Sequence, residues 1–201
     1  MYKAIIFDLG KVLVYFDFKR GFHALEEHCP HAAAEIRRRI AATDLVPRFE
    51  TGLIEPHDFV AALCGVLDLR VSYDEFCLLW NSIFAEALVP ESLLEGLAAR
   101  YRLLLLSNTN AIHFPMVSEN YPFLRHFHDR VLSYEVKAMK PKPEIFLAAV
   151  ERAGCRPEEC FYTDDIAEFV EAARRLGIDA VQFQSAEQLE RELEARGIVW
   201  Q

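Results

Sequence analysis

Acidic side chains directly follow two short apolar runs near opposite ends of the chain. Ala4–Phe7 is followed by Asp8, and Cys160–Tyr162 is followed, after one threonine, by Asp164 and Asp165. A carboxylate at a strand end is suited to act as a nucleophile or as a metal ligand. Adjacent carboxylates repel each other and usually need a cation or a lysine beside them. The alternative to a catalytic or metal-binding role is a structural one, in which each aspartate caps a loop or the helix that follows.

Positive charge is concentrated in one short segment. The chain has six lysines, and three of them, Lys137, Lys140 and Lys142, lie in Lys-Ala-Met-Lys-Pro-Lys-Pro. We interpret Lys142 as a solvated loop residue. Lys140, held by the proline after it, is the better candidate to neutralise a phosphate and the first carboxylate. Ser107 and Asn108 follow another apolar run and supply the donors that phosphoryl oxygens need.

The elements that must position these residues alternate along the chain. Short apolar runs bounded by polar residues suit strands buried on both faces, and five are found: Ala4–Phe7, Leu103–Leu106, Val131–Leu132, Cys160–Tyr162 and Ala180–Phe183. Helix-like stretches lie between the later ones: Glu91–Arg100, Pro143–Ala153, Ala167–Leu176 and Ala186–Arg196. Alternation of this kind predicts an α/β fold with a parallel sheet. Ligands collect at the carboxyl ends of such strands, so the polar clusters are expected to converge.

One long segment interrupts the alternation. Residues 17–88 contain four helix-like stretches and no run that we interpret as a strand: Phe18–Glu27, Ala32–Ala42, His57–Leu67 and Tyr73–Ala85. We therefore predict a core of residues 1–16 and 89–201 and a helical cap of residues 17–88 over the strand ends. Four aromatic residues are candidates to line the pocket between them: Tyr15, Phe16, Phe18 and Trp80.

Composition limits the class of protein. The 201 residues are 52% hydrophobic and 26% charged, as in ordinary globular proteins. A net charge of −9 argues against general nucleic-acid binding or a basic membrane face. No apolar run approaches the ~20 residues that span a bilayer. The five dispersed cysteines contain no C-x-x-C pair, and the N-terminus lacks signal-peptide features, so we expect free thiols and a cytoplasmic location.

Taken in order, the polar clusters resemble the four motifs of the haloacid dehalogenase (HAD) superfamily. Phe7–Val14 looks like motif I, Leu106–Asn108 like motif II, Lys140–Phe146 like motif III and Tyr162–Asp165 like motif IV. In the insert, Phe49–Ile54 resembles a recurring segment of HAD caps. The resemblance covers nearly the whole chain and implies a Rossmann-like three-layer core with a C1-type helical cap. Within the superfamily, the chain is most similar to the bacterial α-D-glucose-1-phosphate phosphatase-like subgroup.

The resemblance implies hydrolysis of a small phosphorylated metabolite through an aspartyl-phosphate. Asp8 would attack phosphorus, and water would then hydrolyse the acyl phosphate. Ser107 and the Asn108 backbone would hold phosphoryl oxygens, and Lys140 would supply positive charge. Mg²⁺ would be held by the Asp8 carboxylate, by the backbone carbonyl of Gly10 and by one or both of Asp164 and Asp165.

One position departs from the usual phosphatase motif. HAD phosphatases usually carry a second aspartate two residues after the nucleophile, where this chain has Gly10. That aspartate protonates the leaving group, and loss of a general acid typically costs about 10²–10⁴-fold in rate. From the sequence alone we therefore expect activity only on phosphates with a relatively good leaving group, such as a sugar 1-phosphate or an acyl phosphate. Lys11 stands where an asparagine is expected and could weaken metal binding or act as a substitute acid.

Two other functions remain open at this point. Haloacid dehalogenases also lack the second aspartate, but they use no metal, and their motif IV acidic pair is typically altered, which the pair Asp164–Asp165 contradicts. A catalytically idle HAD-like scaffold that binds a partner or metabolite is favoured only by Gly10 and Lys11.

Overall fold

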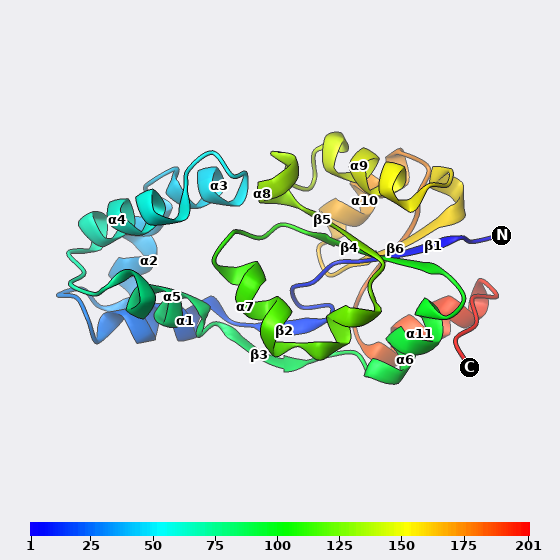
Figure 1. Ribbon diagram of the computed structural model, residues 1–201, viewed down its shortest axis with the longest axis horizontal. Helices are drawn as coiled ribbons and strands as arrows, with labels where there is room; N and C mark the ends of the chain where they lie inside the picture. The colour runs from blue at the N-terminus through cyan, green and yellow to red at the C-terminus, as the bar shows by residue number, and fades with distance from the viewer.

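Five parallel strands form the central sheet, in the order β5-β4-β1-β6-β7 (Figure 1). The computed structural model describes all residues, 1–201. The strands are β1 (Ala4–Phe7), β4 (Arg102–Ser107), β5 (Asp129–Leu132), β6 (Cys160–Asp164) and β7 (Asp179–Gln182). β1 lies in the middle, and later strands are added first on one side of it and then on the other. The carboxyl ends of β4, β1 and β6 therefore meet at one edge, where the chain order switches.

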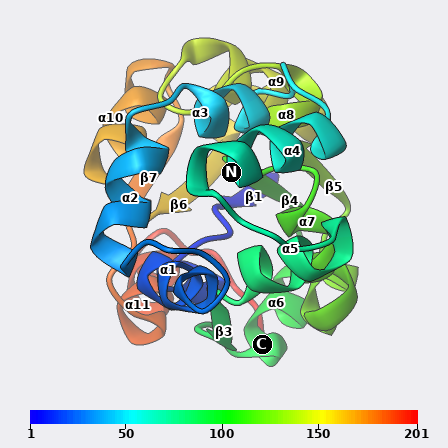
Figure 2. The same ribbon diagram turned by 90° about the vertical axis from the view of Figure 1, so that its left-hand side faces the viewer.

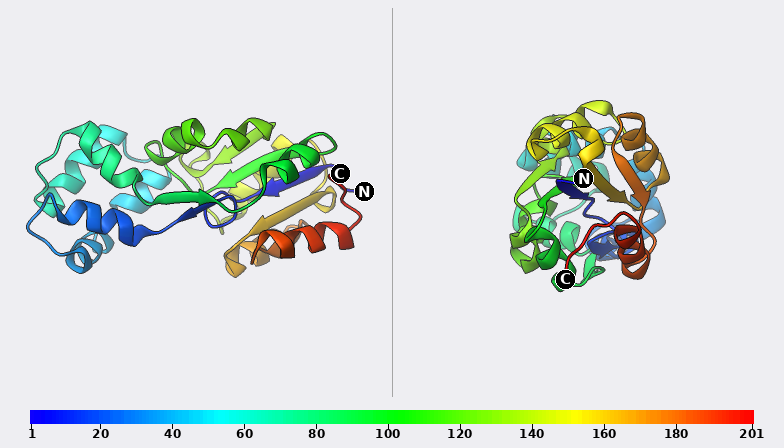
Figure 3. Two further views of the ribbon diagram at one scale, coloured as in Figure 1. Left: turned by 90° about the horizontal axis from the view of Figure 1, so that it is seen from below. Right: turned by 90° about the vertical axis from the view of Figure 1, so that its right-hand side faces the viewer.

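Side chains alternate between the two faces of the sheet. Ile5 and Phe7 belong to one buried cluster, whereas Ala4 and Ile6 belong to another. Helices cover both faces (Figure 3). The first cluster packs under α6 (Glu91–Ala98), α7 (His113–Asn120) and α11 (Ala186–Ala195), and the second under α9 (Pro143–Ala153) and α10 (Ala167–Arg175). The predicted three-layer α/β fold is confirmed.

Residues that favour the start or the end of a helix stand at the ends of several helices. Pro143 opens α9 at a position where a missing N–H costs nothing, and Gly154 closes it in the left-handed conformation, with φ 66°. Ser185 caps α11 by accepting a hydrogen bond from the Gln188 N–H. Three short helical segments complete the core: η1 (Pro122–His126), α8 (Ser133–Val136) and η2 (Pro157–Glu159). None of the helices is long and apolar enough to cross a membrane.

Five helices after β1 form a separate unit at one end of the molecule (Figures 1 and 2). They are α1 (Phe18–Glu26), α2 (Ala33–Ala41), α3 (Leu45–Glu50), α4 (Pro56–Leu67) and α5 (Tyr73–Asn81). The unit has its own apolar cluster, in which Phe49 stacks on Phe59 with ring centroids 4.1 Å apart. At the start of α5, Ser72 and Glu75 form a capping box. Four of these helices match predicted stretches, but α3 was not predicted.

The expectation that residues 17–88 contain no strand is wrong. The helix predicted to run to Ala85 ends at Asn81, and Phe84–Ala87 forms strand β3, antiparallel to β2 (Val14–Phe16). This two-stranded ribbon carries the chain from the core to the helical unit and back. Phe84 packs beside Phe16 with centroids 6.2 Å apart. Short apolar runs do not distinguish strand from helix by spacing alone, so pairing with β2 decides the outcome.

Two hydrogen bonds join the helical unit to the core. Asn81 at the end of α5 is bonded through its Oδ1 to Nδ1 of His113, at 2.8 Å. After α3, the Gly52 carbonyl accepts a hydrogen bond of 2.6 Å from Nζ of Lys137, which follows α8. Gly52 has a φ of 61°, and a Cβ there would lie 2.2 Å from the Tyr134 carbonyl oxygen. Only glycine allows this close approach.

Replacing Gly52 by alanine tests this docking contact. Gly52→Ala should lower the free energy of unfolding by more than about 1–2 kcal/mol, because the left-handed backbone alone costs that much and the Tyr134 carbonyl must also move. Gly65→Ala in α4 is the control, because no atom lies within 4 Å of its Cβ; it should stabilise by about 0.5–1 kcal/mol. Urea denaturation measures both, and equal effects would contradict the docking contact.

Candidate active site

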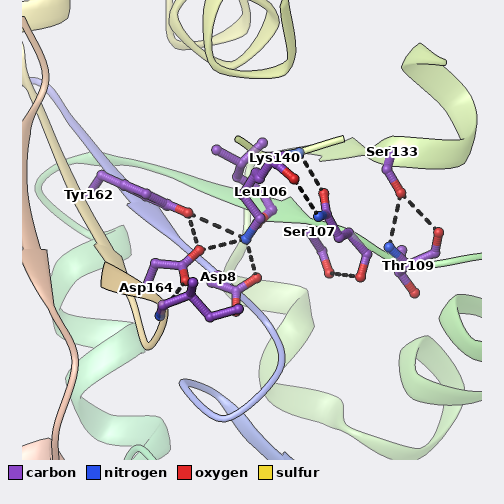
Figure 4. A network of polar contacts seen from close by, with 10 residues as sticks. Asp8, Leu106, Ser107, Thr109, Ser133, Lys140, Tyr162 and Asp164 are labelled. Carbon is purple, nitrogen blue, oxygen red and sulfur yellow. Dashed lines mark hydrogen bonds and ion pairs between the residues drawn. The ribbon is translucent and has the colours of Figure 1, made fainter. Parts of the chain in front are cut away.

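Polar side chains converge at the carboxyl ends of three neighbouring strands. Asp8 follows β1, Ser107 ends β4 and is followed by Asn108, and Asp164 ends β6. Asp8, Ser107 and Asp164 are buried. Figure 4 shows Asp8 and Asp164 facing Lys140, which comes from the loop between α8 and α9. The convergence that the sequence predicts therefore includes a lysine from a fourth segment.

Lys140 holds the two carboxylates together. Its Nζ lies 2.6 Å from Oδ1 of Asp8 and 2.6 Å from Oδ2 of Asp164. It also donates to the Leu106 carbonyl at 3.2 Å and lies 3.3 Å from the Tyr162 hydroxyl. That hydroxyl donates to Oδ2 of Asp164. The ammonium group is thus surrounded by oxygen acceptors in a buried position.

Hydrogen bonds to the neighbouring loop fix the backbone of Lys140. The Asn108 amide donates to the Lys140 carbonyl at 3.0 Å and accepts from the Lys140 N–H at 2.8 Å. Close by, Ser133 accepts from the N–H of Thr109 at 3.0 Å and donates to its carbonyl at 2.9 Å. The Asn108 side chain is therefore occupied in positioning Lys140, which leaves only the Asn108 backbone for a substrate.

Burial and charge oppose each other in this cluster. Burial raises the pKa of Asp8 to about 7, although the Lys140 charge lowers it. Burial alone would lower the pKa of Lys140, but the carboxylates of Asp8 and Asp164 outweigh it and raise that pKa. Burial, together with Asp164, raises the pKa of Tyr162 well above its usual value. Lys140 is therefore charged at neutral pH, and the Tyr162 hydroxyl keeps its proton.

The acidic groups fit a divalent cation. One oxygen from each of Asp8, Asp164 and Asp165 lies within 4.8 Å of the others. Burial raises the pKa of Asp165, and the neighbouring Asp164 raises it further. Lys140 pairs with Asp8 and Asp164, and the Lys11 charge lowers the pKa of Asp165, so three ionised carboxylates exceed the two lysines by one negative charge. Hard oxygen ligands with this charge suit Mg²⁺.

A side chain at position 10 would have to displace the ring of Phe16. A Cβ on Gly10 would lie 2.5 Å from Cε1 of Phe16 in β2. Lys11, with φ 58°, turns the backbone after Gly10, and its Nζ lies 5.3 Å from the centre of the Phe16 ring. The Phe16 ring thus occupies the space into which the second aspartate of the usual motif would project.

A small cavity lies between this edge of the sheet and the helical unit. Its volume is about 50 Å³, and its lining includes Gly10, Ser107 and Asn108 from the core together with Glu50 at the end of α3. His113 also lines it, and burial lowers the pKa of this histidine to about 3. Burial raises the pKa of Glu50 to about 7, and no ion pair offsets this effect.

A larger cavity of about 860 Å³ lies away from the reactive groups. Tyr15, Phe16 and Phe18 line it, in agreement with the sequence analysis, as does Lys11. None of Asp8, Ser107, Lys140 or the acidic pair does so. The expectation that Trp80 lines a pocket is wrong, because Trp80 is buried in the helical unit and stacks on His113.

Three residues near the site had no role in the sequence analysis. Tyr162 precedes Asp164 by two residues on β6, so both face the same side of the sheet, and this period of two could have indicated it. Glu50 belongs to a segment noted only for its resemblance to other caps. His113 carries no sequence signal, since its burial arises from the packing of α7 against α5.

The fold and the site together define a Rossmann-like α/β protein with an acidic centre at the carboxyl ends of its strands. Residues 2–177 match the family described as haloacid dehalogenase-like hydrolase. The chain belongs to this family and is a hydrolase, as the sequence motifs predict.

Three relatives are informative. The chain is 26% identical over 189 residues to D-ribitol-5-phosphate phosphatase of Bacteroides thetaiotaomicron, covering 90% of this chain and 92% of that one. It is 41% identical over 59 residues to fructose-1-phosphate phosphatase YqaB of Escherichia coli, covering 29% of this chain and 31% of that one. A crystal structure of a HAD family enzyme from B. thetaiotaomicron, in complex with magnesium and inorganic phosphate, superposes with a TM-score of 0.83 at 31% identity, covering 92% of this chain and 96% of that one.

Removal of the buried ammonium group should destabilise the protein. Lys140→Met leaves Asp8 and Asp164 buried without a counter-charge, which typically costs about 3–5 kcal/mol. The matched control is Lys142→Met two residues away, because Lys142 is exposed and should change stability by less than about 0.5 kcal/mol. Urea denaturation with a chelator present measures both variants. Equal losses for the two lysines would contradict the bridging role.

The raised pKa of Glu50 predicts a pH-dependent stability difference. The folded protein resists ionisation of this carboxyl, so wild type loses stability relative to Glu50→Gln as pH rises from about 4.5 to about 7. The variant should be more stable by on the order of 2–3 kcal/mol above pH 8, and the difference should vanish near pH 4. Urea denaturation of wild type and Glu50→Gln between pH 4 and pH 8 measures this difference in the free energy of unfolding. A difference that does not depend on pH would mean that Glu50 has an ordinary pKa.

Proposed function

We propose that the protein is a Mg²⁺-dependent phosphatase that hydrolyses a small phosphorylated metabolite through an aspartyl-phosphate on Asp8. The observation that carries this proposal is the position of Lys140, 2.6 Å from both Asp8 and Asp164 at the ends of adjacent strands. A nucleophilic carboxylate, a fixed positive charge and further carboxylates for a metal are thereby brought together. Phosphoryl transfer needs little more than such positioning and charge stabilisation.

The carboxylates of Asp8, Asp164 and Asp165 and the carbonyl of Gly10 are the proposed Mg²⁺ ligands. When bound, the cation would neutralise charge on the phosphoryl oxygens and keep the carboxylates ionised. Asp165 is the only one of the three carboxylates that is partly accessible. The Asp164 side chain already accepts hydrogen bonds from Lys140, Tyr162 and the Ile166 N–H.

The chain's own residues would act on the phosphoryl group in a fixed order. The Asp8 carboxylate attacks phosphorus, and the bond from phosphorus to the ester oxygen breaks. Ser107, through its hydroxyl, and Asn108, through its backbone, donate to phosphoryl oxygens. Lys140 balances the charge that gathers on Asp8 and these oxygens. Water then attacks the acyl phosphate and restores the free carboxylate.

Substrate class follows from the relatives. D-ribitol 5-phosphate and fructose 1-phosphate, which appear in the names of two of them, are small phosphorylated polyols or sugars. We propose a substrate of this kind for the present chain. Its net charge of −9 also suits a small metabolite better than a nucleic acid.

Residues 17–88 are proposed to act as a cap over the site. The cavity of about 50 Å³ exceeds one water, which takes about 30 Å³ in the liquid, but is far smaller than a sugar phosphate. The cap would therefore move away to admit substrate and then close to exclude water. The contact between Lys137 and the Gly52 carbonyl would be remade at each closure.

The alternative functions fit the geometry less well. A metal-free dehalogenase needs no cluster of three carboxylates, yet Asp164 and Asp165 lie beside Asp8. An idle scaffold would bear the cost of several buried charges without using them. Gly10 and Lys11, the features that favoured the scaffold, belong to a turn shaped by Phe16 and do not disturb the Lys140 cluster.

Substitution of the nucleophile tests the proposal. Asp8→Asn should lose phosphatase activity by more than about 10⁴-fold, as enzymes do when they lose a nucleophile. The assay is phosphate release, with and without Mg²⁺, from α-glucose 1-phosphate, glucose 6-phosphate, an acyl phosphate and an aryl phosphate. Asp58→Asn on the exposed side of α4 is the control and should behave as wild type. No Mg²⁺-dependent turnover by the wild type on any of these esters would favour the scaffold.

A further inference from the structure

The core lacks the proton donor that HAD phosphatases usually use. When the bond to the ester oxygen breaks, a sugar or polyol leaves as an alkoxide unless an acid protonates it. The position where HAD phosphatases usually place this acid is Gly10, and a side chain there would have to displace the Phe16 ring, which lies 2.5 Å from the Cβ position. The proton must therefore come from another element that reaches the same space.

Two titratable side chains line the small cavity beside Gly10, Ser107 and Asn108, namely Glu50 and His113. With Oδ1 of Asn81 as acceptor, the single proton of neutral His113 lies on Nδ1, so its Nε2 carries only a lone pair. Burial holds the pKa of His113 near 3, which keeps it neutral. His113 can accept a hydrogen bond in the cavity but has no proton to give.

Lys11 is the other group that the sequence suggested as a substitute acid. It lines the larger cavity, whose lining includes none of Asp8, Ser107 or Lys140. Its Nζ lies 5.3 Å from the centre of the Phe16 ring. The Lys11 charge lowers the pKa of Asp165, so Lys11 lies near one of the proposed Mg²⁺ ligands, and it does not line the small cavity that contains Glu50.

Glu50 is held in the cavity by anchors on both sides. Phe49, the preceding residue, is buried and stacks on Phe59 inside the helical unit. Gly52, two residues later, docks on the core through its hydrogen bond with Lys137. The carboxyl itself accepts no hydrogen bond and forms no ion pair that would hold it ionised, and burial raises its pKa to about 7. It can therefore carry a proton near neutral pH and release it.

We propose that Glu50 is the general acid and base of the reaction, supplied by the helical unit in place of the missing aspartate of the core. This inference rests on the proposed phosphatase function. It also removes the restriction to good leaving groups that Gly10 alone implies.

Glu50 gives one proton in the first step of the reaction and takes one back in the second. In the first step Asp8 forms a bond to phosphorus, the bond to the ester oxygen breaks, and the protonated Glu50 carboxyl gives its proton to that oxygen. The alcohol leaves, and Glu50 becomes a carboxylate. In the second step Glu50 takes a proton from the attacking water while the water oxygen forms a bond to phosphorus. The bond to Asp8 breaks, so inorganic phosphate and the original carboxyl are restored.

Glu50→Gln tests the role through its dependence on the leaving group. An aryl phosphate expels a stable phenolate and needs no acid, whereas a sugar 6-phosphate does. In the variant, the first-turnover rate with the sugar phosphate should fall by about 10²–10⁴-fold. The aryl phosphate should still give a burst of about one phenolate per enzyme. The phosphoryl group should then remain on Asp8, where intact-protein mass spectrometry detects it, because the water lacks its base.

The control is Glu55→Gln, an exposed glutamate of the same unit, which should match wild type. The aryl burst itself shows that Glu50→Gln is folded. If the first-turnover rate of Glu50→Gln falls equally with the sugar phosphate and the aryl phosphate, or falls with neither, the role of Glu50 is overturned and the phosphatase proposal stays intact. A wild type that turns over neither substrate, or an Asp8→Asn variant that turns over both, would instead overturn the proposed function, and the Glu50 role with it.

Discussion

The candidate site depends on one buried ammonium group. Asp8 and Asp164 end adjacent strands and are taken out of water by the helices around them, so each would be costly as an ion without Lys140 between them. The lysine in turn needs its loop fixed, and Asn108 does this with two hydrogen bonds to the Lys140 backbone. The segments after β4 and before α9 are thus coupled to those after β1 and β6 through a single charge.

Much of this arrangement can be predicted from the sequence, because the physics that creates it is local. Apolar runs too short for helices and closed by polar residues predict buried parallel strands, and parallel strands bring their carboxyl ends to one edge. Asp8, Ser107 and Asp164 follow from that rule alone. Lys140 could be singled out because lysines are scarce in this chain and cluster there. The HAD-like resemblance added the order of the motifs, and the family match agrees with it.

What the sequence did not predict arises from tertiary packing. Phe84–Ala87 has no strand signal of its own and becomes β3 only by pairing with β2. That ribbon directs Phe16 against Gly10, and this contact is visible only in three dimensions. From the sequence, Glu50 was noted only as part of the Phe49–Ile54 segment that resembles other HAD caps. Its environment is created by Gly52, which lets α3 approach the backbone of α8 more closely than any residue with a Cβ could.

The proposed catalytic groups are divided between the core and the helical unit, which affects how the reaction would be controlled. The proposed nucleophile Asp8, Lys140 and the proposed metal ligands all belong to the core, so in this proposal the core alone could bind a phosphate. With Glu50 as the proton donor, the reaction is complete only when the helical unit is docked and the Gly52 carbonyl meets Lys137. In the docked arrangement, the cavity that Glu50 shares with Gly10 and Ser107 has a volume of about 50 Å³. If Glu50 is the proton donor, docking of the helical unit would both deliver the proton and cover the proposed acyl phosphate. A ligand that binds through its phosphate but prevents docking would then be turned over slowly.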